Sequence, residues 1–261
     1  MRFAAPVRLR DGSLPTVSRP KGQNATHFVH DYLKQLILDL TIPPDTLIME
    51  TDVVAVTGLS RTPIREALLR LHEERLVELL PRRGALVPRI SAGQVRELYD
   101  VRLLLETRAA EIICEDGIYV TNRLLALCDE QDELDRSGAL ASALIQVDRR
   151  FHSTLIAMAG NSVMAAINDS LGDQHQRVGV LSFTLDRRRC AIAVENHRAI
   201  ARALAERDLP ATKKTLEEHH IVGERDLERL LLTEQSRPHV GPREVISPGA
   251  VQARPSIRSS R

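Results

Sequence analysis

Apolar residues recur at helical spacing in three stretches near the start of the chain, which predicts three helices. These stretches span residues 29–40, 50–56 and 62–77. The segment 41–46 contains two adjacent prolines and is predicted to be the turn between the first two helices. Gly58 can adopt the positive φ that ends the second helix, so the third helix would follow after a short turn.

A β-hairpin is predicted directly after the third helix. Two apolar runs, 78–80 and 85–88, are separated by a turn that contains Arg82, Arg83 and Gly84. The tip of the hairpin would therefore be basic. Three helices followed by a basic hairpin form a winged helix-turn-helix, an arrangement that binds DNA.

The start of the third helix carries polar side chains that suit DNA. Ser60 or Thr62 can cap the helix, and Arg61 and Arg65 lie beside them, outside the apolar stripe. Hydroxyl and guanidinium groups contact phosphates and base edges in protein–DNA interfaces. The alternative is an ordinary solvated helix start. With the hairpin tip, these four residues form the predicted DNA-contacting set.

From residue 91 to about 233 the apolar pattern is helical, and no strand is predicted. One helix is predicted from 163 to about 179, followed by a short segment over 181–185. Asp208 is expected to cap the last helix, and Pro210 fits its first turn. The predicted fold class is therefore mainly α: a winged helix-turn-helix followed by an all-helical bundle of six or seven helices.

Composition agrees with a helical protein. Aromatic residues make up 3% of the 261 residues, and tryptophan is absent. No apolar run approaches the roughly 18 residues that suggest a transmembrane helix, and we find no signal-peptide pattern at the N-terminus. Cys114, Cys128 and Cys190 have no metal-ligand spacing and are expected to be reduced thiols. We therefore expect a cytoplasmic protein that does not enter a membrane.

The net charge of +1 is spread unevenly. Residues 1–24 and 235–261 each carry five basic and one acidic side chains and are rich in Pro, Ser and Gly. Disorder is the favoured interpretation of both, although they could add nonspecific phosphate contacts. Residues 25–90 carry eight basic and nine acidic side chains, so their positive groups must gather on one face. The predicted division is a disordered basic arm, the DNA-binding domain, a helical domain over 91–233 and a disordered basic tail over 234–261.

Four residues of the helical part match the ligand types of a metal ion. Asp148 and His152 are four residues apart and so share one helix face. His197 and His219 lie eleven residues before and after Asp208, so two antiparallel helices would bring them level. One carboxylate and three imidazoles in a bundle core would bind Zn²⁺ or a similar divalent ion. The alternative is that these are separate histidines, because the chain has nine of them.

Both parts of the chain resemble one family of bacterial regulators. The segment Leu59–Leu68 is close to the consensus of the DNA-binding domain of the GntR family, and residues 27–90 are similar to that whole domain. Asp45 and Arg75 stand where the family pattern has glycine. Residues 91–232 resemble the FCD effector domain of the FadR subgroup. The segments that carry this second resemblance are RLLLE (102–106), DRRFH (148–152), GN (160–161), ENHRAI (195–200) and LEEH (216–219).

The resemblance also implies site residues. In metal-containing members of the family, the positions that bind the metal correspond here to Asp148, His152, His197 and His219. The metal could be Zn, Ni or Mn. His220 is the second choice as a late ligand, because it points about 100° away from its neighbour on the helix.

Arg102 has two interpretations. In the family, an arginine at this position often faces the effector pocket, where it would pair with a small carboxylate effector. The alternative is a helix-surface ion pair with Glu106, four residues on.

The resemblance implies a homodimeric, DNA-binding transcription regulator, expected to be a repressor that binds a pseudo-palindromic operator. A small organic acid in the helical domain would alter its DNA affinity. Two other functions stay open: a metal-dependent hydrolase, and a DNA binder whose metal is purely structural. The effector, the operator and the identity of the metal do not follow from the sequence.

Overall fold

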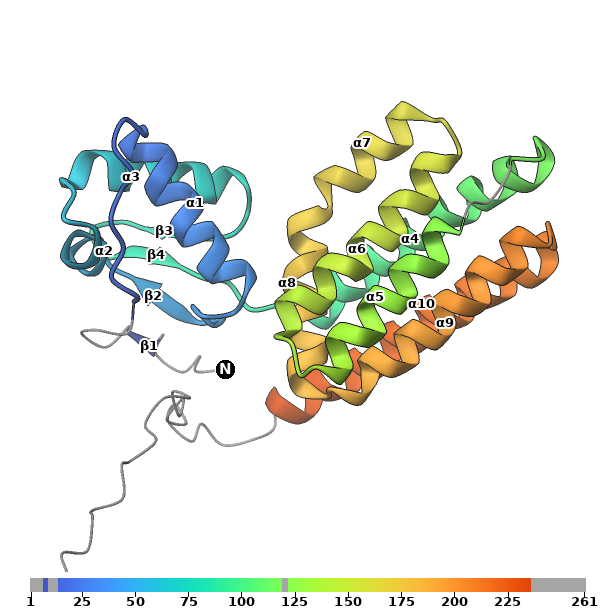
Figure 1. The fold of residues 1–261 in the computed structure, drawn as a ribbon. Coiled ribbons are helices and arrows are strands. Elements are labelled where there is room, and N and C mark those ends of the chain that lie inside the picture. Colours follow the sequence, from blue (N-terminus) through green and yellow to red (C-terminus); the bar gives the residue numbers. More distant parts are fainter. Residues whose placement is uncertain (1–6, 9–13, 119–121, 236–261) are drawn as a thin grey trace, which may run out of the picture.

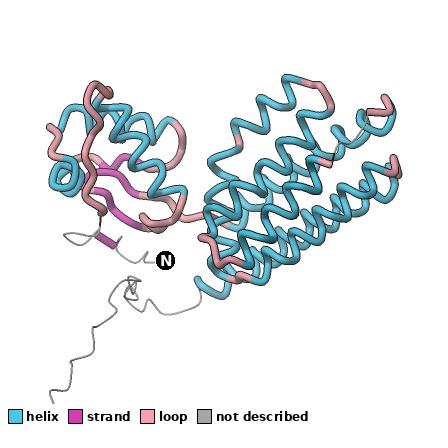
Figure 2. Tube along the Cα trace, viewed as in Figure 1, coloured by secondary structure: helices cyan, strands magenta, loops and turns pink. Residues whose placement is uncertain are grey.

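The computed structural model describes residues 7–8, 14–118 and 122–235 of the chain. A small N-terminal part with three helices and a sheet lies beside a larger part built from helices alone (Figure 1). All strands among these residues belong to the N-terminal part (Figure 2). The predicted mainly α fold, a winged helix followed by a helical bundle, is confirmed. No helix in the described ranges is long and apolar enough to span a membrane.

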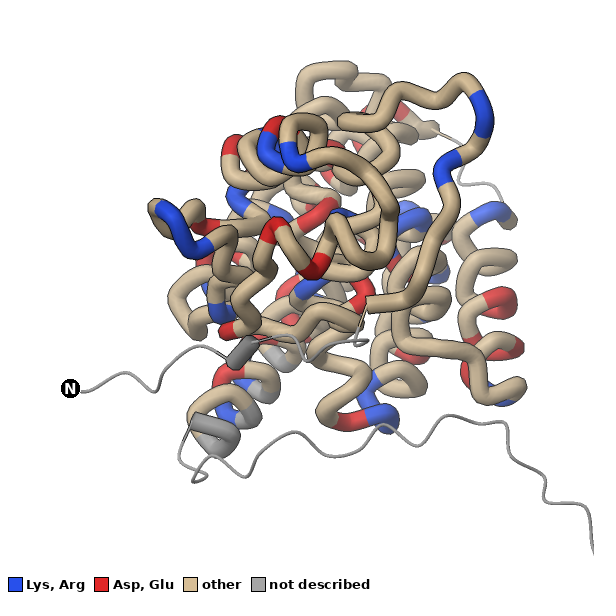
Figure 3. The backbone as a smooth tube through the Cα atoms, turned by 90° about the vertical axis from the view of Figure 1, so that its left-hand side faces the viewer, with Lys and Arg blue, Asp and Glu red and all other residues tan. Residues whose placement is uncertain are grey.

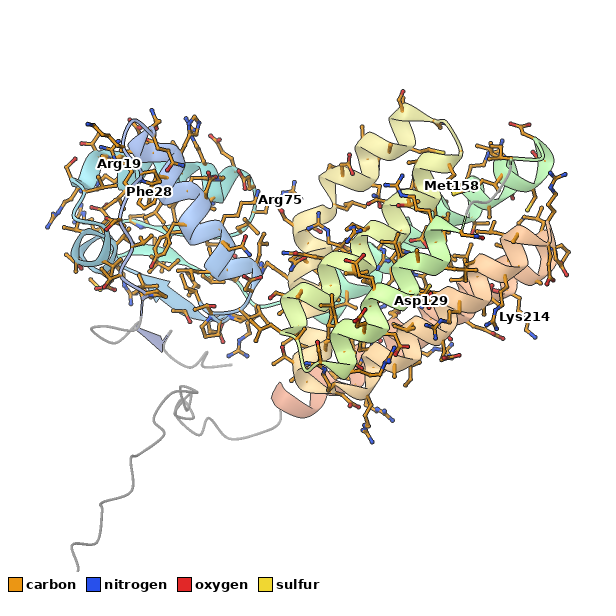
Figure 4. The ribbon with its side chains drawn as sticks, in the orientation of Figure 1. Arg19, Phe28, Arg75, Asp129, Met158 and Lys214 are labelled. Atoms are coloured by element: carbon orange, nitrogen blue, oxygen red, sulfur yellow. The ribbon has the colours of Figure 1, made fainter. Side chains whose placement is uncertain are left out.

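The N-terminal part is a winged helix-turn-helix with its own apolar core. Its sheet has the strand order β1-β2-β4-β3. Phe28 and the buried stripe of the third helix belong to this core, which fills the space between helices and sheet (Figure 4). The elements are α1 (Ala25–Leu38), α2 (Glu50–Thr57), α3 (Arg61–Glu73), β1 (Val7–Arg8), β2 (Thr46–Ile48), β3 (Glu78–Leu80) and β4 (Gly84–Leu86).

Two local predictions in this part are wrong. The third helix ends at Glu73 rather than near residue 77, because Arg75 adopts a left-handed turn with φ of 60°. Strand β2, which follows the predicted turn over 41–46, was not predicted at all. It is only three residues long, and it exists because Leu47 pairs with Leu86 of the wing strand β4. A pairing partner so far along the chain leaves no local signal.

The prediction of a disordered arm over residues 1–24 is wrong for residues 14–24. Leu14 is buried in the N-terminal core. The hydroxyl of Tyr32 donates to the carbonyl of Pro15, and the backbone N–H of Val17 donates to the carbonyl of Val56 at 3.3 Å. Apolar side chains between the polar ones therefore anchor this segment. The predicted tail lies outside the described residues from 236 onward.

The positions that depart from the family's glycine pattern keep the backbone shape that glycine would give. Asp45 has a φ of 63° and Arg75 a φ of 60°. A left-handed conformation costs a residue with a side chain about 1–2 kcal/mol relative to glycine. The loops thus keep their course at a cost in stability.

The C-terminal part is a bundle of seven helices among the described residues, as predicted. They are α4 (Ala92–Glu115), α5 (Arg123–Arg136), α6 (Ala141–Met158), α7 (Ser162–Ser170), α8 (Gly172–Leu185), α9 (Arg188–Ala205) and α10 (Leu209–Gln235). The prediction places one helix break near residue 179, but in the structure this break lies at Leu171. Gly179 lies inside α8, where a Cβ atom would overlap the side chain of Ile145 on α6. This glycine permits close helix packing and does not end a helix.

Helix α8 faces the N-terminal part. Asp173 in its first turn pairs with Lys34 of α1 at 2.7 Å. Arg177, one helical turn further on, donates from Nη2 to the carbonyl of Pro88 in the connection between β4 and α4 at 2.9 Å. Ile90 of that connection packs against Val178 in a small apolar cluster. One helix thus contacts both the N-terminal part and the segment that joins the two parts.

Gly84, at the start of wing strand β4, should tolerate no side chain. Its φ is 114°, and a Cβ atom would overlap the carbonyl oxygen of Ile48. Gly58 also has a positive φ of 67°, but nothing lies within 4 Å of its Cβ position. We therefore expect Gly58→Ala to lower the free energy of unfolding by about 1–2 kcal/mol. Gly84→Ala should lower it by about 1–3 kcal/mol more.

Urea unfolding of both glycine variants, followed by circular dichroism, measures this difference. Equal losses in the two variants would show that the wing can move away from β2.

Candidate functional site

Five helices of the bundle direct ionisable side chains into one buried region. Each of these side chains belongs to a residue at most 9% exposed. Buried polar groups at this density are unfavourable unless they bind one another or a ligand. The residues are Arg102 and Glu106 on α4, Asp148 and His152 on α6, His175 on α8, His197 on α9, and His219 and His220 on α10.

The four predicted metal ligands lie together in this region. His152, His197 and His219 each offer a ring nitrogen, and these atoms lie within 4.8 Å of one another. The Nε2 atoms of His152 and His197 are 3.1 Å apart. Asp148 approaches both, with 3.7 Å from Oδ2 to Nε2 of His152 and 3.6 Å from Oδ1 to Nε2 of His197.

Local structure explains why these side chains meet. Asp148 and His152 share one face of α6, as their spacing predicts. Helices α9 and α10 form an antiparallel pair around a tight turn (Figure 1). Asp208 stabilises the start of α10, because its Oδ1 atom accepts the backbone N–H of Ala211 at 2.9 Å. That pairing brings His197 level with its partner on α10.

A second cluster lies on the other side of His152. Glu106 Oε2 accepts from Nδ1 of His152 at 2.9 Å and from Nε2 of His220 at 3.1 Å. We assign the ring proton of His152 to Nδ1 from this contact, which leaves the Nε2 lone pair directed at His197 and Asp148. A carboxylate that fixes an imidazole in this way is the usual support of a metal-binding histidine.

Two residues of the site were not predicted as such. His175 contacts Asp148, with 3.1 Å between Nε2 and Oδ2. It has no acidic or histidine neighbour at helical spacing on its own face of α8, so the sequence held no signal for it. Glu106 was considered only as a partner of Arg102, because its imidazole partners are 46 and 114 residues away.

The site holds the protonation states that a metal requires. Burial lowers the pKa of His152 and His197 to about 3, and that of His175 to about 4. Burial opposes ionisation of Asp148 as well, but the hydrogen bond from His175 and the other imidazoles hold its pKa well below the usual range. The histidines are therefore neutral and the carboxylate is charged near neutral pH, which are the ligand forms of these groups.

The donor set fits a divalent ion. Two nitrogens bound to one metal at about 2.0–2.1 Å lie roughly 3 Å apart, close to the separation of the His152 and His197 nitrogens. Three neutral imidazoles and one carboxylate suit Zn²⁺ or Ni²⁺ better than Ca²⁺ or Mg²⁺, which prefer oxygen ligands.

Arg102 is buried and points into the same region. It is 2% exposed, its carbon Cζ lies 5.5 Å from the ring centre of Tyr99, and its Nε is 3.6 Å from Oε1 of Glu106. Its Nε and Nη2 atoms have no hydrogen-bond partner. It lines a cavity together with Asp148 and His219. The alternative of a helix-surface pair is wrong, because Glu106 is fully buried too.

The predicted DNA-contacting residues lie around a groove of the N-terminal part. The lining includes Arg61 and Arg65 from α3 and Arg82, Arg83 and Gly84 from the wing. Basic and acidic positions alternate over this end of the molecule (Figure 3), so the groove gathers arginines locally rather than within one broad basic face.

The start of α3 is exposed beside this groove. Ser60 occupies the N-cap position, but its side chain makes no capping hydrogen bond. Thr62 follows it in the first turn and is exposed as well. Arg65 is 64% exposed at its side chain and pairs with Glu50 at 2.7 Å. These hydroxyl and guanidinium groups are therefore accessible to a ligand.

The fold and these two sites define a class: a winged-helix part joined to a helical bundle with a buried cluster of ionisable side chains. Residues 25–87 match the model of the bacterial regulatory proteins of the gntR family, and residues 97–221 match the model of the FCD domain. The chain belongs to the GntR family of bacterial transcription regulators, with an FCD domain as its second part. Its FadR-like subgroup assignment is consistent with this pairing.

Several regulators are similar to this chain. One relative is an HTH-type transcriptional regulator from the TAR-I ttuE-ttuC' intergenic region of Agrobacterium vitis, which is 32% identical to this chain over 132 residues. The aligned residues cover 49% of this chain and 76% of the relative. This chain is 28% identical over 198 residues to the HTH-type transcriptional repressor RspR of Escherichia coli K12, covering 73% of this chain and 83% of RspR.

Solved structures share the fold. A GntR transcriptional regulator from Rhodococcus sp. RHA1 matches with a TM-score of 0.64 and 24% identity, over 77% of this chain and 96% of that one. E. coli McbR/YncC matches with a TM-score of 0.63 and 20% identity, over 80% and 99%. The two relatives from Agrobacterium vitis and E. coli K12 are transcription regulators, so the hydrolase alternative gains no support from them.

Proposed function

We propose that this protein is a homodimeric repressor whose operator affinity changes when a small organic acid binds beside a divalent metal in the helical bundle. The observation that carries the proposal is the meeting of Asp148 and three neutral histidines next to Arg102, whose buried Nε and Nη2 groups make no hydrogen bond. RspR, one of the similar proteins, is itself a repressor. A two-fold symmetric dimer requires a pseudo-palindromic operator.

The two parts of the chain divide the work in this proposal. Residues 25–90 bind the operator, and residues 91–233 bind the effector and form the dimer. Asp148, His152, His197 and His219 would hold the metal. An octahedral ion, or a Zn²⁺ ion with expanded coordination, keeps positions open for a carboxylate oxygen. The metal would supply a Lewis-acidic site for the acid, and Arg102 would pair with the same carboxylate.

Helix α8 can connect the two sites. His175 lines the cavity, while Asp173 pairs with Lys34 of α1 and Arg177 with the connection at Pro88. An acid that binds more tightly to one placement of α8 also favours one placement of the DNA-binding part. Effector binding then shifts the population of DNA-binding states by the difference in its affinity for the two.

The proposed metal site predicts that a variant can lose its metal and still bind the operator. His197→Ala should weaken metal affinity by more than the roughly 10–100-fold that loss of a supporting residue costs. It should also abolish the release of operator by acid. Operator affinity without effector should persist, because the N-terminal part has a separate core. His27→Ala, at an exposed position of α1, is the matched control.

Elemental analysis of the purified variants, followed by operator-release titration, measures both effects. Full metal occupancy in His197→Ala would remove this residue from the ligand set. Loss of the metal with an intact effector response would show that the metal is structural and that the acid binds elsewhere.

The groove predicts two kinds of DNA contact. Arg65→Ala should cost about 1–3 kcal/mol of specific binding if the side chain exchanges Glu50 for a guanine. Arg61→Ala should act in the same way. Replacing Arg82 and Arg83 with alanine should instead weaken binding to all sequences and flatten the salt dependence by roughly one unit of slope per lost phosphate contact.

Gel-shift titrations at several salt concentrations distinguish these contacts. Arg136→Ala, on an exposed face of α5, controls for the loss of a positive charge. If Arg61→Ala and Arg65→Ala both bind the specific operator with unchanged affinity, α3 is not the helix that contacts the bases. An unaltered salt slope in the double variant would place the wing away from DNA.

The contact between α8 and α1 predicts that a variant can bind the effector normally while the effector changes operator affinity less. Asp173→Asn removes the charge that faces Lys34 but leaves the pair between Lys34 and Glu74. The effector should bind with unchanged affinity, while its effect on operator affinity should fall by roughly 2–30-fold. Asp169→Asn, at an exposed position of α7, is the control.

Calorimetric titration of the effector and fluorescence anisotropy of labelled operator measure the two quantities separately. A full effector response in Asp173→Asn would exclude this contact as the connection between the sites.

A further inference from the structure

The cavity beside the histidine cluster contains a second guanidinium with unused hydrogen-bonding capacity. Arg189 of α9 donates from Nη2 to the carbonyl of Gly223 on α10 at 2.7 Å. Its Nε and Nη1 atoms are buried and have no hydrogen-bond partner. A charged donor buried without an acceptor is destabilising, so the two free nitrogens of Arg189 call for a partner such as an ion or a ligand.

Arg102 and Arg189 line the same cavity from different helices. Arg102 projects from α4 and Arg189 from α9. The positive charge of each favours the ionised form of the Tyr99 hydroxyl and so opposes the rise in its pKa that burial causes. Gly223 also lines the cavity, and a Cβ atom there would come within 2.9 Å of the Tyr99 ring. The cavity offers about 50 Å³ to water-sized groups. That is room for a few such groups, so only a small acid fits.

The charges around the cavity are unbalanced toward positive. Asp148 is the acidic residue among its described lining residues, against the two arginines. Glu106 behind the lining offsets part of the charge of Arg102. With Glu106 counted, a divalent metal held by Asp148 and the histidines would leave an excess of two positive charges, because imidazoles bind a metal in their neutral form. Two negative charges on a ligand would balance this excess.

We propose that the effector is a small acid with two anionic groups, one held at the metal and Arg102 and the other by Arg189. This inference rests on the proposed function, since it places the first group at the proposed metal site. A guanidinium binds carboxylates and phosphates alike through paired N–H donors, so the second group is either a carboxylate or a phosphate. Arg189 then selects dianionic over monoanionic acids.

A purely structural role does not account for Arg189. Its single hydrogen bond to Gly223 uses one nitrogen, and the two nitrogens without partners are the ones that a ligand could occupy. Its neighbour Arg188 gives a matched control, because that side chain is 87% exposed and pairs with Asp186 outside the cavity.

Calorimetric titration of the metal-loaded, full-length protein with matched acids tests the inference. The pairs are succinate against butyrate, malate against 2-hydroxybutyrate, and phosphoglycolate against glycolate. We expect at least one dianion to bind about 10-fold or more tightly than its monoanionic counterpart. Arg189→Gln should remove this preference by weakening the dianion alone, whereas Arg188→Gln should leave it intact. Arg189→Met provides a second replacement, with folding checked by circular dichroism and metal content.

The possible outcomes separate this inference from the proposed function. Equal affinity for the members of every pair, or a dianion preference that survives in both Arg189 variants, overturns the inference. If monoanions bind and their binding needs Arg102 and the metal but not Arg189, the proposed effector site stands. Only the proposal that Arg189 holds a second anionic group then fails. If no acid binds the metal-loaded protein, both fail. The pair with the larger preference tells whether the second group is a carboxylate or a phosphate.

Discussion

The burial of charge inside the helical bundle is the constraint on which the rest of the structure depends. Asp148, Glu106 and Arg102 lie among apolar helices where desolvation strongly disfavours isolated ions. They are tolerated because imidazoles and an opposite charge surround them at hydrogen-bonding or ion-pair distance. Arg102 and Glu106 share α4, but the imidazole partners of the two carboxylates come from α6, α8 and α10, so the cluster forms only when those helices pack in one register.

The apolar core holds that register and keeps the two parts of the molecule distinct. Phe151 of α6 stacks on the ring of His197 of α9, with 4.2 Å between ring centres and 13° between ring planes. Gly179 lets α8 approach α6 closely beside the cavity. The winged helix has its own core, so it can fold and bind DNA while the bundle changes its ligand state. In the proposed mechanism, regulation depends on the few contacts between α8, α1 and the connecting segment.

Much of the fold could be predicted because its signals are local. The apolar stripe of α3, the turn before it and the basic tip of the wing lie within thirty residues, and they identify a winged helix-turn-helix. In the bundle, Ser91 and Asp208 mark helix starts that the structure shows capped by their own side chains. Where a signal was short or absent, prediction failed: strand β2 needs β4 to exist, and the segment over 14–24 is ordered only by the core that it covers.

The sequence by itself determined the residue types and their helical phase. Asp148 and His152 share a helix face because they are four residues apart, and that holds in any helix. Tertiary structure decided which faces meet. His175 and Arg189 reach the cavity, and Glu106 reaches the imidazoles behind it, through the packing of α8, α9 and α4, and nothing in their local sequence distinguishes them from surface residues. The reason is physical: spacing fixes direction around one helix axis, whereas the separation of side chains on different helices depends on how the axes pack.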